Sequence, residues 1–195
     1  MNRSASELRT RTLALASVFV TWSAVLAAGD TKTVTIFEGR QIEIPMPAGW
    51  SFQTKLDEER GVQTVELADP KKEIQLDVSF LPDPDGEMST RKALEEQAKR
   101  IFVFYLSQSI EREMKLVSFE APGGIGVSTT FTDRKLDPKH IPEGEKLMST
   151  TGLRSWKGVY LIFTLLSDSK DSAAYRSALE IVQKGLKQVK VPTSF

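Results

Sequence analysis

The chain has no cysteine and a single histidine among its 195 residues. Without cysteine it can form no disulfide, no zinc knuckle and no iron–sulfur cluster, and it has no thiol nucleophile. The one histidine, His140, argues against a histidine-rich metal centre and against a histidine-dependent catalytic triad. The 26 basic and 26 acidic residues cancel, so no overall charge attracts nucleic acid or an anionic membrane. These absences exclude more functions than the residues present identify.

Residues 1–28 have the pattern of a cleavable signal peptide. Three arginines precede an apolar run over residues 13–26, which ends at the small residues Ala27 and Ala28. We expect cleavage after one of these alanines, export to the periplasm or the extracellular space, and no stable membrane span after processing. A retained anchor is the alternative, although a helix over this run would rise only about 21 Å against a hydrocarbon core of roughly 30 Å.

Residues 29–195 are expected to form one domain, since no composition break or fixed repeat divides them. A chain of about 170 residues buries roughly 70% of its unfolded surface, which is enough for a core without disulfides. Its first half shows the two-residue alternation of antiparallel strands. Residues 34–36 and 42–44 alternate around Glu38-Gly39-Arg40 and predict a hairpin, and Ile74 to Phe80 alternate without a fault. Shorter strands are expected near Trp50 and near Val65.

Spacings of three and four residues predict two helices. The first begins at residues 89–90, where a hydroxyl can cap it, and runs to about Arg112. The second begins near residues 171–172, and its buried face extends to Leu186. These are the helical elements around which the strands are expected to pack.

Strands return between the two helices. Hairpins are expected over residues 116–131, around Pro122-Gly123-Gly124, and over residues 146–166, around Lys157-Gly158. The last strand, residues 159–166, is apolar on both faces, which is typical of the middle of a sheet. The sequence therefore predicts an α+β domain: a twisted antiparallel sheet of about seven or eight strands, packed against at least two helices.

This order of elements resembles the PsbP-like fold. The local likeness lies in the strand and turn Ile42-Glu43-Ile44-Pro45-Met46-Pro47-Ala48-Gly49-Trp50, and in Thr164-Leu165-Leu166-Ser167-Asp168 ahead of the last helix. Members of that superfamily include extrinsic subunits of the photosynthetic oxygen-evolving complex, a nuclear-import factor that binds the GTPase Ran, bacterial envelope proteins and chaperones of secreted effectors. The resemblance implies a binding or accessory module more than an enzyme, and it assigns no active-site residue.

Four segments resemble sites that bind ligands or catalyse reactions, and each also has a purely structural interpretation. Gly123 to Gly126 lead into β-forming residues, so we interpret them as a hairpin turn and not as a phosphate-binding loop. Asp83 to Glu87 form a strand-ending turn, with weak surface cation binding as the alternative. Asp57-Glu58-Glu59 and His140 are expected in solvated loops, with acid–base catalysis as the alternative. We therefore predict no catalytic residue, no metal ligand set and no cofactor.

Three aromatic residues are the candidate partner-binding positions. Trp156 precedes a Lys-Gly turn, where the end of a sheet would leave it partly exposed, and Tyr160 follows that turn. Phe104 ends the run Phe102-Val103-Phe104, which makes the first helix apolar over more than one side. For Trp156 and Tyr160 packing at the rim of the sheet is the favoured interpretation, and for Phe104 two-sided burial of the helix stands beside a partner contact.

The sequence favours an exported, non-catalytic binding or accessory protein of the cell envelope, with a protein or peptide partner. This hypothesis predicts an exposed apolar patch. One alternative is a carrier or sensor of a lipid, sugar or cell-wall fragment, which predicts a concave apolar pocket of about 300–1,000 Å³. The other is a hydrolase, which predicts a cleft where a strongly shifted pKa lies beside a nucleophile. The partner's identity and the oligomeric state stay open at this stage.

Overall fold

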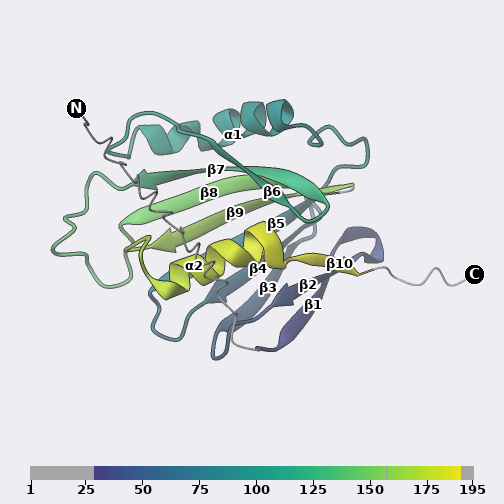
Figure 1. The fold of residues 1–195 in the computed structure, drawn as a ribbon, viewed down its shortest axis with the longest axis horizontal. Helices are drawn as coiled ribbons and strands as arrows, with labels where there is room; N and C mark the ends of the chain where they lie inside the picture. Colours follow the sequence, from purple (N-terminus) through teal and green to yellow (C-terminus); the bar gives the residue numbers. More distant parts are fainter. Residues whose placement is uncertain (1–28, 157, 190–195) are drawn as a thin grey trace, which may run out of the picture.

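The computed structural model describes residues 29–156 and 158–189, and this part of the chain is α+β with two antiparallel sheets (Figure 1). The predicted signal peptide lies outside the described residues. The strands are β1 Thr31–Thr35, β2 Gln41–Pro45, β3 Ser51–Asp57, β4 Val62–Ala68, β5 Ile74–Pro82, β6 Val117–Ala121, β7 Gly124–Thr132, β8 Met148–Trp156, β9 Val159–Ser167 and β10 Lys187–Val189. The helices are α1 Arg91–Leu106 and α2 Ala173–Glu180, with short helical turns η1 Phe37–Gly39 and η2 Ile181–Gly185.

The larger sheet has seven strands in the order β3-β4-β5-β9-β8-β7-β6, and different elements cover its two faces. On one face α1 packs on β7 and β8, where Leu94, Ala98 and Phe102 meet Val127 and Leu153. On the other face lie α2, which crosses β5 and β9 in Figure 1, and the smaller sheet β1-β2-β10. The α+β class and the antiparallel sheet are therefore confirmed.

The strand predicted for the middle of a sheet is found there. β9 pairs with β5 on one side and with β8 on the other, each through nine residue pairs. Its residues Val159, Leu161, Phe163 and Leu165 are buried toward α2 and the smaller sheet, while Ile162 packs beneath α1. Both faces are covered, which explains why this strand has no polar face.

The larger sheet has the predicted number of strands, but the first hairpin belongs to a separate, smaller sheet that was not predicted. After β2 the chain turns at Gly49, whose φ of 80° suits glycine, and the Met46 N–H donates to the Asp30 carbonyl at 2.8 Å. The third strand of this sheet is β10, which begins directly after Leu186, where the predicted buried face of the second helix ends. The π-helical turn η2 follows α2, and after it Lys187–Val189 pair with the free edge of β2.

The first helix begins where predicted but ends six residues early, at Leu106 instead of Arg112. Thr90 caps its start, because its side chain accepts a hydrogen bond from the Ala93 N–H. Beyond Leu106 the chain is held by β7: the Ile110 N–H donates to the Thr132 carbonyl at 3.0 Å. These bonds to a strand replace the bonds that a longer helix would have made.

Glu111 also ties this segment to β7, and its contacts predict a pH-dependent stability. Burial opposes its ionisation, but hydrogen bonds from the N–H and the hydroxyl of Thr132 outweigh burial and lower the pKa of Glu111 below 4.5. A carboxyl whose pKa is lower in the folded state stabilises the fold above its unfolded pKa and loses that effect as the pH falls.

We expect Glu111→Gln to lower the free energy of unfolding at pH 7 by about 1 kcal/mol, since the group is partly solvated. Urea titrations at several pH values would measure the difference between the two proteins. The difference should shrink as the pH falls from 5 through the folded pKa, because the wild-type carboxyl then becomes neutral as well. A difference that stayed constant down to about pH 2 would contradict this account.

Candidate functional site

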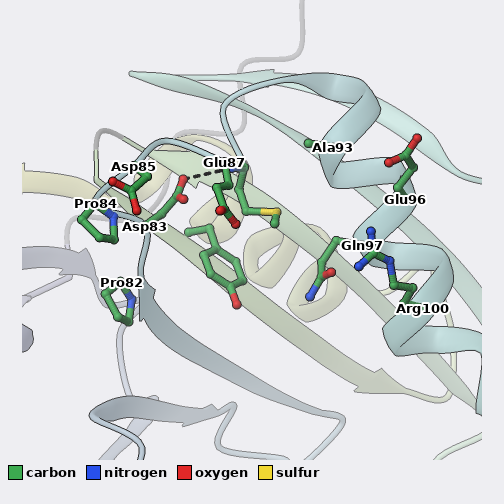
Figure 2. Close-up of a pocket in the computed structure, with 11 residues that line it drawn as sticks. Pro82, Asp83, Pro84, Asp85, Glu87, Ala93, Glu96, Gln97 and Arg100 are labelled. Atoms are coloured by element: carbon green, nitrogen blue, oxygen red, sulfur yellow. Dashed lines mark hydrogen bonds between the residues drawn. The ribbon is translucent and has the colours of Figure 1, made fainter.

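A cleft of about 530 Å³ lies between α1, the loop that follows β5, and Tyr160 of β9 (Figure 2). The loop forms one wall through residues 82–88, and α1 forms the other wall. The residues that line it are Pro82, Asp83, Pro84, Asp85, Glu87, Met88, Ala93, Glu96, Gln97, Arg100 and Tyr160. Charged and amide side chains thus dominate this hollow, and Tyr160 supplies its aromatic ring.

Asp83 holds the loop wall in place. It is only 6% exposed, and its carboxylate accepts a hydrogen bond from the Met88 N–H at 3.1 Å, drawn as a dashed line in Figure 2. Its own N–H donates to the Gly158 carbonyl, and its carbonyl accepts from the Gly86 N–H. With Asp83 committed to the turn, the exposed carboxylates of Asp85 and Glu87 remain to face a ligand. The predicted strand-ending turn is therefore confirmed, and it also forms one wall of the cleft.

The helical wall consists of residues spaced by turns of α1. Ala93, Gln97 and Arg100 follow one another at intervals of four and three residues, so they share one stripe of the helix. Figure 2 shows Gln97 and Arg100 projecting from α1 across from Asp83, Asp85 and Glu87. Phe104, four residues after Arg100, continues the same stripe and is 53% exposed. Phe104 does not line the cleft, but it places an exposed aromatic ring one turn of the helix beyond Arg100, beside the ring of Tyr105.

Tyr160 is half-buried on the face of the sheet that α1 covers. It pairs with Ser155 of β8 in the register, two residues from the Leu153–Ile162 pair beneath α1. Burial, and in second place the negative charge of Asp83, raise the pKa of Tyr160 above its usual 10.0. At neutral pH the phenol is therefore uncharged and can both donate and accept a hydrogen bond.

The structure places the three predicted partner-binding residues differently. Tyr160 lines the cleft, Phe104 lies one helical turn beyond the cleft-lining Arg100, and Trp156 belongs to the opposite face of the sheet. Trp156 is 8% exposed, not partly open at a sheet end as expected. The reason is local packing: its ring lies 4.5 Å from the Arg154 guanidinium, and a side chain at Gly123 would come within 2.7 Å of its Nε1.

The other chemically active segments lie apart from the cleft. Gly123, with φ of 77°, forms the turn between β6 and β7, as predicted. His140 is in a loop with 84% of its side chain exposed, and its Nδ1 lies 3.2 Å from Asp137. Among residues 29–156 and 158–189, no three or more acidic or histidine side chains are placed to hold a metal ion. The helices in that same part of the chain are too short and too polar to cross a membrane.

Sequence reasoning did not identify the polar lining of the cleft. Gln97 and Arg100 had no signal beyond the mixed charge of a solvated helix. Asp85 and Glu87 had one usable signal: several carboxylates beside prolines, just ahead of a helix. What brings the two sets together is the packing of α1 on the sheet.

A scan against protein-family models, a search of curated proteins and a search of solved structures each returned no match to this chain. The likeness to the PsbP-like fold therefore stays a prediction.

Proposed function

We propose that this chain is an exported, non-catalytic accessory protein of the cell envelope, and that it binds a protein or peptide partner along α1 and the adjoining cleft. The observation that supports this most is the continuity of the surface. One stripe of α1 runs from the cleft-lining Gln97 and Arg100 to the exposed ring of Phe104. Such a surface combines hydrogen-bonding groups with an aromatic anchor, as protein interfaces do.

The charged side chains of this surface are available to a partner. Asp85, Glu87 and Arg100 form no ion pair within the described part of the chain. Val103, next to Phe104, is 56% exposed although it is apolar. Exposed apolar side chains that gather in one patch often mark the surface where a partner binds.

The two alternatives have less support. A lipid carrier needs an apolar pocket, whereas the cleft of about 530 Å³ is lined by carboxylates, an amide and a guanidinium. A hydrolase needs a nucleophile beside an acid–base group. His140 lies in an exposed loop, while Ser128, Ser149 and Ser155 lie on β7 and β8, within the sheet.

A photo-cross-linking amino acid at Tyr160 or at Phe104 would test the proposal in the native envelope. We expect both positions to capture the same protein, since both belong to one surface. We expect Phe104→Ala to reduce the capture at position 160 by about tenfold, as loss of an aromatic anchor does. Mass spectrometry of the cross-linked bands would identify the partner and measure the reduction.

Val117 supplies the matched control, because it is apolar and 64% exposed but lies on the edge strand β6. A cross-linker there should not capture the same protein, and Val117→Ala should leave the capture at position 160 unchanged. Failure to capture any protein at positions 104 and 160 would contradict the proposal. Retention of a lipid or glycan in place of a protein would favour the carrier.

A further inference from the structure

The strand β3 is an open edge of the seven-stranded sheet. It forms seven residue pairs with β4, without a bulge, and within the described residues no strand pairs with its other side. Six of its seven residues are exposed, including Leu56 at 58%. The opposite edge, β6, is shorter at five residues, and the turn η2 contacts it. β3 is thus the longer and less covered of the two edges.

The usual protections of an edge strand are weak in β3. Natural edges are blocked by proline, by bulges or by lysines that stand over the edge. β3 contains no proline, and its one lysine, Lys55, is turned back to the sheet, with its Nζ 2.5 Å from Glu66 of β4. The hydrogen bond and the charge of Glu66 raise the pKa of Lys55, as expected for an ammonium that lies beside a carboxylate of the neighbouring strand. Its charge is therefore directed away from the open edge.

The sequence of β3 is complementary to itself in one antiparallel register. Pairing all seven residues of two copies places Thr54 opposite Thr54 of the partner subunit. Ser51 then lies opposite Asp57, and Gln53 opposite Lys55, so no two like charges face each other directly. On the other face the exposed Leu56 lies opposite Phe52 of the partner subunit, which gives it an aromatic contact. A register centred on Lys55 instead of Thr54 would place Leu56 opposite Thr54 of the partner subunit, so Leu56 would lose its contact with Phe52.

We propose that two copies of this chain associate through antiparallel β3 strands centred on Thr54, with Leu56 of each copy packed on Phe52 of the partner subunit. The proposal is independent of the proposed function, because it uses the edge of the sheet and not the cleft. A contact through one strand per subunit buries less than the roughly 1,200 Å² of a stable complex, so we expect a dissociation constant on the order of 0.1 mM.

Charge changes at Ser51 test the register without disturbing the fold. Ser51 is exposed, and the residue directly opposite it on β4 of the same subunit is the uncharged Ala68. In the dimer Ser51 lies opposite Asp57 of the partner subunit, and the two-fold symmetry makes two such pairs. We expect Ser51→Lys to lower the dissociation constant roughly two- to tenfold and Ser51→Asp to raise it by a similar factor. Sedimentation equilibrium up to about 1 mM protein would measure both.

Spin labels give an independent readout, because the chain has no native cysteine. Labels at Thr54→Cys should lie close together across the two-fold axis. Labels at Ser51→Cys should be separated by about 20 Å along the strands, since their positions differ by six residues. Leu56→Asp should abolish the dimer, with an unchanged circular dichroism spectrum. A monomer throughout the concentration range, equal effects of both Ser51 changes, or a shorter distance at position 51 than at 54 would each overturn the proposal.

Discussion

Replacement of Arg154 by alanine is expected to lower the free energy of unfolding by about 3–5 kcal/mol. Arg154 is the largest fully buried side chain, on β8, and it joins three separate parts of the fold. Its Nη1 donates to the Val182 carbonyl at 2.8 Å and its Nη2 to the Pro122 carbonyl at 2.7 Å, while its guanidinium lies over Trp156. The alanine variant would leave two carbonyls without donors and a cavity beneath the indole.

Burial lowers the pKa of Arg154 from 12.5 to about 10, so the group still carries its charge at pH 7. Within the described residues no carboxylate pairs with it. Arg154→Met therefore separates the two effects, since it removes the buried charge and the donors but keeps most of the volume. We expect the methionine variant to be less stable than the wild type and more stable than the alanine variant.

Urea unfolding followed by tryptophan fluorescence would measure these differences. The exposed Arg60, with 80% of its side chain in solvent, is the matched control, and Arg60→Ala should change stability by less than about 0.5 kcal/mol. A methionine variant as stable as the wild type would show that the two hydrogen bonds only offset the cost of burying the charge. That result would refute the stabilising role we assign to Arg154.

The second large effect is expected at Gly152, in the middle of β8. A β-carbon there would lie 2.5 Å from the Val127 carbonyl oxygen and 2.6 Å from the ring of Phe163. The Val127 carbonyl belongs to a paired strand and the ring of Phe163 is fully buried, so a new methyl group would have to displace backbone or core. We expect Gly152→Ala to lower the free energy of unfolding by about 3 kcal/mol, measured by the same urea titration.

Two further variants make this prediction specific. Phe163→Leu should recover part of the loss in the double variant, because it removes the ring but leaves the contact with the Val127 carbonyl. Ser149→Ala, on the same strand, removes a buried hydroxyl that has no hydrogen-bond partner, and it should not destabilise the protein. A loss below about 1 kcal/mol for Gly152→Ala would mean that the sheet adjusts more easily than its pairing indicates.

The elements that could be predicted are those whose pattern is local. Ile74 to Phe80 alternate because one face of β5 is buried, and the start of α1 follows from the hydroxyl of Thr90. The end of α1 was not predictable in this way, since Ile110 continues the apolar spacing yet is 60% exposed. Its position is decided by backbone bonds to β7, which no local pattern records.

The separate sheet and the cleft were missed for the same physical reason. β10 is three residues long, and Lys187–Val189 have no strand signal; they are extended because β2 offers them a free edge. Tyr160 could be selected as an aromatic residue and Asp83 to Glu87 as an acidic turn, but Gln97 and Arg100 could not. Only the packing of α1 against the sheet makes these residues neighbours.

The position of β10 has a consequence for the order in which the protein can fold. β2 lies between β1 and β10, so the smaller sheet joins the earliest strand of the described chain to the latest. A chain threaded through a translocation channel from its N-terminus would deliver β1 and β2 long before β10. If the protein is exported as we propose, this smaller sheet stays incomplete until β10 has crossed, so its completion is one of the last steps of folding outside the channel.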